Sequence, residues 1–446
     1  MTKRDIVRGR RGKGRIGMRP RVVQKLKLKW VVIFASCFLF LSGLVFYLLT
    51  FLNVKTMFAS TLYTWNGSVN SLWTEPLNWT PNGIPDSTDM ISISGSVNPL
   101  LMDGDRKIAN LTCNNSSNID LSGFVLSLSG NFISNAGSLI ELNGGVITIS
   151  GNANFNGGIV SDSDSSGFVM TTGSSCVFGN SSGGPTMNAM VNVNAGNVTL
   201  RSTTFNRGVI ISKRGSGNDN SFGGNTYNGI TEIINNGTGN LVLSNNVRDV
   251  FNQIVTFSNN GSAGIYPGYN DATGTLFNDS VYVNCSAGAG IYFSAGSGNS
   301  ILAESKRINI GLNGFSAGTL SLRHFTTSTS IDQNLLLTGT AIASFGPATT
   351  FGNELKVEAP GILLNGAVFS SKASLSKTGT GNNSGAGGNI FNDSTQIINS
   401  GSGFLLSGNT LPDNFNAALS ISNPGTGDIY LAHNSAGNIF NNVVTI

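Results

Sequence analysis

A short alternation of apolar and polar positions recurs in the second half of the chain. Each copy begins with an aromatic residue followed by Asn, and its fifth and seventh residues are mostly apolar. The six clearest copies start at Tyr227, Phe251, Phe277, Phe391, Phe415 and Phe440. Because side chains alternate between the two faces of a strand, each copy is predicted to be one strand with a buried face. No segment after residue 60 has a helical period.

The copies follow two periods. Neighbouring copies start 24 to 26 residues apart, and Gly/Asn/Ser-rich turn sequences separate them. A longer period of 164 residues lies above this spacing and indicates two copies of a multi-coil block. A shift of the sequence by 164 residues aligns five pairs: Met187 with Phe351, Phe205 with Phe369, Lys213 with Lys377, Asp249 with Asp413 and Tyr266 with Tyr430.

Units of this length, with two or three short strands each, indicate a solenoid, in which stacked coils bury a continuous core. We therefore expect an all-β fold: a parallel β-solenoid, or right-handed β-helix, over residues 95–446. A special N-terminal cap unit is expected over residues 61–94. The Asn beside each aromatic is expected to form a ladder along the stack and to satisfy backbone groups of the turns. Four aromatic residues are expected to stack inside: Phe251, Phe277, Phe415 and Phe440.

The N-terminal region has a different pattern. Residues 30–52 form a run of 23 residues without a charge, long enough for a helix that crosses a bilayer. Residues 1–29 before it carry 12 Lys or Arg and one acid. By the positive-inside rule, the basic tail is expected to stay in the cytoplasm while residues 30–52 contact the membrane and the body is exported.

Two interpretations of residues 30–52 stay open. The length of the apolar run favours an uncleaved signal-anchor, since export signals have shorter apolar cores. The small residues Ala59 and Ser60, directly before the start of the repeat region, favour a cleaved signal. A true start at Met18 would also shorten the basic tail. Either way, the body is predicted to be at the cell surface or outside the cell.

Composition narrows the classes of function. Only 11% of all residues are charged, and after residue 29 there are 14 Lys or Arg against 21 Asp or Glu. Nucleic-acid binding by the body is therefore disfavoured, because phosphate contacts need clustered cations. The cysteines Cys37, Cys113, Cys176 and Cys285 lie far apart without metal-binding spacing, which favours buried apolar thiols.

A weak calcium candidate lies in one turn. Asp162, Asp164 and Ser166 resemble the opening of a calcium-binding loop, but Gly173 stands where such a loop needs its Glu. The prediction is accordingly no metal and no cofactor, with these three residues as the only cation candidates.

The start of the body carries a motif. Trp65-Asn-Gly, Trp73, Asn78-Trp79, Pro81, Pro85 and Asp89 precede the Gly/Asn-rich coils. Together with the phased Phe-Asn, this pattern over residues 61–446 resembles large repetitive cell-surface proteins of the Bacteroidota. The resemblance implies adhesin-like proteins with filamentous-haemagglutinin-like β-helices. Such proteins commonly end in a sorting domain for type IX secretion, which this sequence does not contain.

The three tryptophans of the motif have two interpretations. Trp65, Trp73 and Trp79 could stack on sugar rings of an extracellular polysaccharide. Alternatively they seal the first coil, because the end of a solenoid needs a cover. The second interpretation is favoured, since large aromatic side chains are usually packed.

Three classes of function compete: an adhesive or structural surface protein, a polysaccharide lyase or glycosidase with a β-helix fold, and a spacer without ligand. The only histidines, His324 and His433, lie in different coils, and Asp249 and Asp413 recur with the scaffold. The chain is therefore predicted not to be an enzyme. Its expected partners are an extracellular polysaccharide or a host or neighbouring cell surface.

The last residue, Ile446, falls at the seventh position of the sixth copy of the repeat. At this position the earlier copies continue into a turn and another strand. The expectation from the pattern is that the gene product is truncated and that its open coil associates end to end with another molecule.

Overall fold

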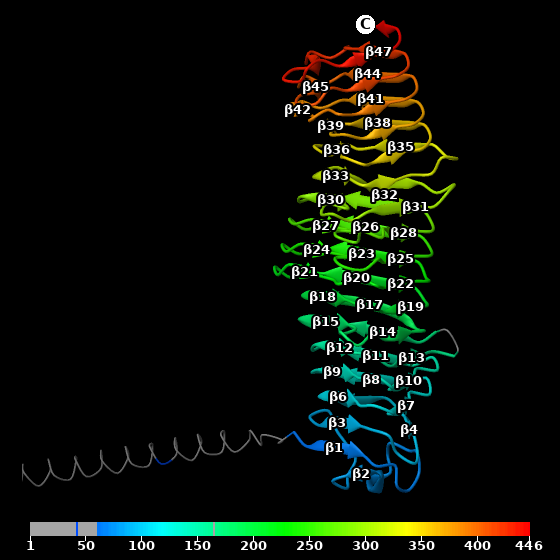
Figure 1. The fold of residues 1–446 in the computed structure, drawn as a ribbon. Coiled ribbons are helices and arrows are strands. Elements are labelled where there is room, and N and C mark those ends of the chain that lie inside the picture. The colour runs from blue at the N-terminus through cyan, green and yellow to red at the C-terminus, as the bar shows by residue number, and fades with distance from the viewer. Residues whose placement is uncertain (1–41, 43–59, 164–165) are drawn as a thin grey trace, which may run out of the picture. The chain divides into compact units, whose positions relative to one another are not determined.

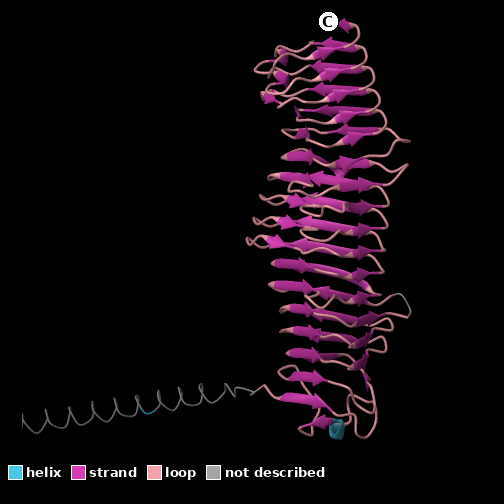
Figure 2. Cartoon of the chain, in the orientation of Figure 1, coloured by secondary structure: helices cyan, strands magenta, loops and turns pink. Residues whose placement is uncertain are grey.

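The computed structural model describes residue 42 and residues 60–163 and 166–446. Residues 60–446 form one compact unit, a three-sided parallel β-solenoid with a right-handed winding (Figure 1). Figure 2 shows strands joined by turns along the stack, with one short helix at its N-terminal end. In these residues the one helix is a 3-10 turn, η1 (Pro76–Asn78). The predicted segment 30–52 lies outside the described residues except for Ser42.

Each coil supplies one short strand to each of three faces. The first face consists of β1 (Leu62–Trp65), β2 (Trp79–Thr80), β3 (Met90–Ile93), β6 (Asn110–Cys113), β9 (Phe132–Ser134), β12 (Ala153–Phe155), β15 (Ser175–Phe178), β18 (Asn197–Leu200), β21 (Asp219–Asn220), β24 (Leu241–Val242), β27 (Ile265–Tyr266), β30 (Gly290–Phe293), β33 (Thr319–Leu322), β36 (Ile342–Phe345), β39 (Gly361–Leu364), β42 (Asn383–Ser384), β45 (Leu405–Gly408) and β48 (Ile429–Ala432).

The second face is one continuous sheet of 16 strands. It consists of β4 (Leu100–Leu101), β7 (Asn118–Asp120), β10 (Leu139–Glu141), β13 (Ile159–Ser161), β16 (Thr186–Met187), β19 (Thr204–Phe205), β22 (Thr226–Tyr227), β25 (Val250–Phe251), β28 (Thr275–Phe277), β31 (Ser300–Leu302), β34 (Phe325–Thr326), β37 (Thr350–Phe351), β40 (Val368–Phe369), β43 (Ile390–Phe391), β46 (Asn414–Phe415) and β49 (Ile439–Phe440).

The third face consists of β5 (Arg106–Ile108), β8 (Val125–Leu128), β11 (Val146–Ile149), β14 (Phe168–Thr171), β17 (Met190–Ala195), β20 (Val209–Lys213), β23 (Thr231–Asn235), β26 (Val255–Asn259), β29 (Val281–Cys285), β32 (Ile308–Phe315), β35 (Gln333–Leu336), β38 (Leu355–Ala359), β41 (Ala373–Lys377), β44 (Thr395–Asn399), β47 (Leu419–Ser422) and β50 (Val444–Thr445). Among the described residues, no helix has both the length and the apolar character to cross a bilayer.

The predicted stack of aromatic side chains is confirmed. Phe251 pairs in register with Phe277, and their parallel rings lie 5.3 Å apart. Phe415 and Phe440 are paired and stacked in the same way at 5.4 Å. Phe251, Phe277 and Phe415 are buried, whereas Phe440 is 41% exposed because β49 is the last strand of its sheet. The rings therefore form a ladder along the inside of the second face.

The asparagine ladder is also confirmed, on the outside of the same corner. The side-chain amide of Asn252 donates to Asn228 at 2.6 Å, and that of Asn278 donates to Asn252 at 2.7 Å. The backbone of the corner is bonded separately, since the Asn252 N–H donates to the Tyr227 carbonyl at 2.8 Å. The Asn252 side chain therefore bonds to its neighbours in the ladder, and the expectation that it satisfies backbone groups of the turn is not met at this corner.

The prediction that each copy of the repeat is a single strand is wrong. The copy at Phe251 ends β25 on the second face, and Val255 then begins β26 on the third face. The residues between them turn a corner of the coil. Phe251, Val255 and Phe257 are nevertheless all buried. Positions one, five and seven would share a face in a straight strand as well, so alternation alone could not distinguish the two arrangements.

The start of the body continues the solenoid instead of forming a separate unit. β1 pairs in parallel with β3, and β3 pairs with β6, so residues 61–94 belong to the sheet of the first face. On its other edge β1 pairs with β2 in the antiparallel direction. β2 therefore covers the edge that the first coil would otherwise expose, as expected for a cap.

Candidate functional site

The three tryptophans proposed for sugar stacking lie inside the first coil. Trp65 is 2% exposed, and Trp73 and Trp79 are fully buried. The ring of Trp79 lies 4.9 Å from Trp65 and 5.1 Å from Trp73, edge to face. Trp79 Nε1 donates to the Trp73 carbonyl at 2.8 Å. Protein atoms cover these rings, so their burial matches the cap interpretation and leaves no exposed face for a sugar.

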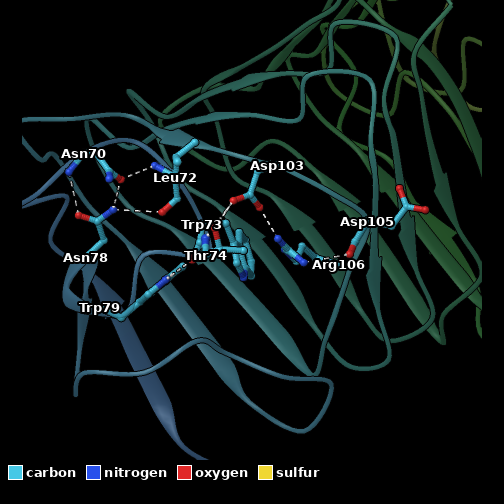
Figure 3. A network of polar contacts seen from close by, with 9 residues as sticks. All are labelled: Asn70, Leu72, Trp73, Thr74, Asn78, Trp79, Asp103, Asp105 and Arg106. Carbon is cyan, nitrogen blue, oxygen red and sulfur yellow. Dashed lines mark hydrogen bonds and ion pairs between the residues drawn. The ribbon is translucent and has the colours of Figure 1, made fainter.

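Polar contacts hold this cap together (Figure 3). Asn78 is buried; its Nδ2 donates to Asn70 at 2.9 Å and to the Leu72 carbonyl at 3.1 Å. On the other side, Arg106 forms an ion pair with Asp103 and lies over the Trp73 ring, 5.8 Å from its centre. These bonds fix the loop that carries Trp73, which is a structural role.

The calcium candidates do not converge on a cation site in the part of the chain that the structure describes. Asp162 is buried, and its carboxylate accepts the N–H groups of Gly144 at 3.0 Å and Gly167 at 2.8 Å. Asp164 lies outside the described residues. No group of three or more acidic, histidine or cysteine side chains that could hold a metal occurs among the described residues. Asp162 therefore acts as a turn acceptor.

The repeated aspartates are also engaged within the scaffold. Asp249 is buried, and its Oδ1 accepts both the N–H and the side-chain amide of Asn225 at 2.8 Å. Its Oδ2 accepts the Ser244 hydroxyl at 2.7 Å. Burial raises the pKa of Asp249 to about 6. Asp413 accepts the same pair of bonds from Asn389 at 2.9 and 2.7 Å, which supports a structural role for both.

The buried cysteines match the expectation of apolar thiols. Cys113, Cys176 and Cys285 are free and buried. Burial raises the thiol pKa to about 12 for Cys113 and Cys176, and to about 11 for Cys285. Thiols with such pKa values are protonated at neutral pH and are poor nucleophiles. Cys37 lies outside the described residues.

A cluster of tyrosines on the outer surface of the first face was not predicted from the sequence. In β27, Ile265 points inward and is fully buried, and Tyr266 therefore points outward. The in-register pairing of Ile265 with Ile291 places Tyr292 beside Tyr266 on the next coil. The two rings stack at 5.1 Å with an angle of 14° between their planes.

A third tyrosine packs edge to face against this stack. The ring of Tyr269 lies 5.9 Å from that of Tyr266 at an angle of 89°. All three tyrosines are half-buried. Tyr292 Oη donates to the Ala289 carbonyl at 2.6 Å, which holds its ring in place. Burial, with a contribution from the neighbouring rings, raises the pKa of Tyr266, so its phenol stays neutral at physiological pH.

Asparagines complete a shallow hollow beside the rings. The hollow has a volume of about 250 Å³ and is lined by six residues: Asn218, Asn220, Asn240, Val242, Tyr266 and Tyr269. The side-chain Oδ1 of Asn218 accepts the backbone N–H of Asn240 at 2.8 Å, and the Oδ1 of Asn240 accepts the backbone N–H of Gly264 at 3.0 Å. These bonds fix the orientation of the two side-chain amides that line the hollow. The lining contains no carboxylate.

Aromatic faces beside fixed amides suit a neutral sugar. The C–H face of a sugar ring is apolar and packs on an aromatic ring, while its hydroxyls exchange hydrogen bonds with amides and phenols. Hydrolysis of a glycosidic bond normally needs two carboxyl groups that flank the bond. Because the lining has none, this arrangement can bind a sugar but has no acid or base to cleave it.

Three larger hollows lie on the outside of the third face, and two of them contain an aromatic residue. One, of about 480 Å³, is lined mainly by apolar side chains that include Met170, Met190 and Phe168, together with Asn192 and Glu232. Another, of about 680 Å³, is polar and contains Arg307 and Asp332, but its aromatic residue, Phe315, is fully buried. Of these hollows, the one on the first face combines two tyrosine rings with three asparagine side chains and has no charged residue in its lining.

A sequence signal for the tyrosine hollow exists. Asn220, Val242, Tyr266 and Tyr292 follow one another in register on successive coils, at intervals of 22, 24 and 26 residues. The repeat analysis followed the Phe-Asn position and so missed this second column. No known protein family, curated protein or solved structure matches the chain. The function therefore has to be argued from the geometry of this column.

Proposed function

We propose that the chain is an exported, surface-displayed or secreted β-solenoid that binds a neutral extracellular polysaccharide and performs no chemistry of its own. The observation that carries the proposal is the outward stack of Tyr266 on Tyr292, with Tyr269 and the asparagines beside it. Export rests on the hydrophobic run of residues 30–52 behind its basic tail.

The charge of the body supports a neutral ligand. After residue 29 acidic residues outnumber basic ones by 21 to 14, so an acidic polysaccharide would meet a repulsive surface. The hollow itself is lined by uncharged side chains. Binding through ring faces and amides is weak at each contact, and a repeated scaffold suits a ligand that is itself a repeating polymer.

The test is affinity electrophoresis of the full-length chain in mild detergent, in gels that contain neutral or acidic polysaccharides. A neutral polymer should retard the chain, and Tyr266→Ala should weaken its binding at least about tenfold, because a stacking face is lost. Tyr266→Phe should bind nearly as well as the original chain. Tyr282→Ala is the matched control, since Tyr282 lies on the third face in β29.

Two outcomes would count against the binding site. Retardation by no polysaccharide would remove the proposed function, and equal weakening by Tyr266→Ala and Tyr282→Ala would show that the hollow is not the site. Release of reducing sugar or unsaturated products from the polymer would favour a polysaccharide-cleaving enzyme instead.

Export has its own test. Protease added to intact spheroplasts that express the chain should degrade the body from about residue 61 and spare residues 1–29. A body that stays protected until the membrane is dissolved would contradict the proposed topology.

A further inference from the structure

The first face carries a second pair of outward rings in the other copy of the 164-residue block. Tyr430 occupies the position that corresponds to Tyr266, and it pairs in register with Leu406 as Tyr266 pairs with Val242. The side-chain Oδ1 of Asn382 accepts the backbone N–H of Phe404 at 3.1 Å. This bond corresponds to the one between Asn218 and Asn240 in the first hollow.

The edge-to-face contact with the outward tyrosine involves different residues in the two copies. At the second place, the ring of Phe404 lies 5.7 Å from that of Tyr430 at an angle of 78°. At the first, Tyr269 makes the same edge-to-face contact with Tyr266. Phe404 stands at the position of Asn240, and His433 at that of Tyr269. An edge-to-face ring pair thus occurs in both copies but is made by residues at different coil positions, so it does not follow simply from copying the sequence.

We infer that Phe404 and Tyr430 form a second binding site for the same neutral polysaccharide, and that one long glycan chain spans both sites. This inference rests on the proposed function of the tyrosine hollow. Tyr430 is 41% exposed, and its hydroxyl donates to the Asp428 carboxylate at 2.8 Å. That bond orients the ring, and the exposed carboxylate accepts sugar hydroxyls and repels an acidic polymer.

The spacing of the two sites fits a long polymer. β27 and β48 are separated by seven coils on the first face, at about 4.8 Å a coil, which places Tyr266 and Tyr430 roughly 34 Å apart. Figure 1 shows the intervening strands along one side of the stack. A short oligosaccharide can occupy only one site, whereas an extended chain along the axis reaches both.

Small side chains occupy much of the path between the sites. The outward column continues in register from Tyr292 to Ser321, Ser344 and Leu363. The two serines are nearly buried, at 7% and 9% exposure, so neither stands above the surface. A polysaccharide that lies on this column meets no bulky side chain before Leu363.

The inference is tested with the full-length chain in mild detergent, by calorimetry with a neutral polysaccharide that it binds and with short fragments of the same polymer. Two sites per chain are expected for fragments, and either Tyr266→Ala or Tyr430→Ala should reduce the number to one. For the long polymer, each single variant should lose at least tenfold in affinity, because binding through two linked sites is lost. Tyr430→Phe, which keeps the ring, should lose little.

The results separate this inference from the proposed function. If Tyr266→Ala abolishes binding of fragments and polymer while Tyr430→Ala changes neither affinity nor stoichiometry, the second site is wrong and the first stands. If the original chain binds polymer and fragments with equal affinity per chain, the spanning arrangement is wrong. If it binds no neutral polysaccharide, both the proposed function and the second site fail.

Discussion

Residues 187–282 and 351–446 are two copies of one coil pattern, and they keep the same scaffold with different interiors. In the first copy the rings of Tyr227 and Phe251 stack at 4.5 Å, and in the second Phe391 and Phe415 stack at 4.6 Å. Other interior positions have changed, and Asp219 of the first copy corresponds to Asn383 of the second. Both copies therefore keep the ring ladder, although the second lacks the interior charge of Asp219.

Each copy buries one lysine side chain at the same coil position. Lys213 and Lys377 are both fully buried, and each Nζ donates to the carbonyl two residues ahead, at 2.7 and 2.6 Å. Lys213 also lies 3.8 Å from the Asp219 carboxylate. Lys377 has instead a second carbonyl, that of Gly403, at 3.0 Å. Backbone carbonyls of the turns thus keep a buried amine in place in both copies.

The ring ladder should give the largest effect. Phe251→Ala leaves a cavity between the rings of Tyr227 and Phe277 and should cost roughly 3–5 kcal/mol. Phe415→Ala should cost less, because its neighbour Phe440 is partly exposed and the local packing is looser. Hydrogen exchange should show the loss in the strands that flank each site, since solenoid coils interact mainly with their neighbours.

Ile230→Ala is the matched control for the ladder, because Ile230 is 64% exposed and its truncation should change stability by less than about 0.5 kcal/mol. Equal protection loss for Phe251→Ala and Phe415→Ala would contradict the expected difference between the middle of the stack and its last coils.

The ladder was predictable from the sequence because one residue type recurs at one coil position. The corner after Phe251 was not, since alternation of side chains does not reveal a turn between positions one and five. The tyrosine hollow needs residues from several coils, and Asn218 and Tyr266 become neighbours only when each coil length is known. Trp73 and Trp79 carried a pattern that fitted both a cap and a sugar site, and only their burial separated the two.

The buried lysines should give the next largest effect and the clearest difference between the copies. Lys213→Met leaves the buried Asp219 carboxylate without its cation and should cost about 3 kcal/mol at pH 7. Lys377→Met leaves only carbonyls without a donor and should cost roughly 1–2 kcal/mol. Urea unfolding of the full-length variants in detergent measures both costs.

The double variant Lys213→Met with Asp219→Asn has neither the buried amine nor the buried carboxylate. It then matches Lys377→Met, which has Asn383 at the position of Asp219. It should recover most of the difference, so that its cost approaches that of Lys377→Met. A double variant as unstable as Lys213→Met alone would mean that the ion pair does not cause the difference between the copies.

The buried aspartates should give a pH dependence of up to roughly 3 kcal/mol. The native pKa of Asp249 is about 6, above the ordinary value of 3.8, so the native state keeps a proton that the unfolded state releases. Its contribution is complete below pH 4 and is lost as the pH rises to about 6. Asp249→Asn should remove this loss, so the variant gains stability relative to the original chain between pH 4 and pH 8.

Asp413→Asn should change in the same direction by a smaller amount. Burial raises the pKa of Asp413 too, but Asp271, which raises the pKa of Asp249 further, is replaced by Ser435 at the corresponding position. Urea unfolding across this pH range compares the two variants. A pH profile unchanged by Asp249→Asn would show that this carboxyl does not titrate between folded and unfolded states as expected.

The smallest effect should come from the asparagine ladder, where the copies differ at one rung. In the first copy Asn206 donates to Asn188 at 2.6 Å and accepts from Asn228 at 2.7 Å. The corresponding residue of the second copy is Ser370, next to Asn392 on the following coil. Ser370→Asn should add one exposed amide bond and gain about 0.5 kcal/mol, whereas Asn206→Ser loses two such bonds and should cost about 1 kcal/mol.

Because both positions lie outside the core, neither change should alter the ring ladder. Hydrogen exchange of the neighbouring corners separates a local gain in stability from a change in the whole stack. A loss of stability for Ser370→Asn would mean that the amide ladder only accompanies the coil geometry and does not stabilise it.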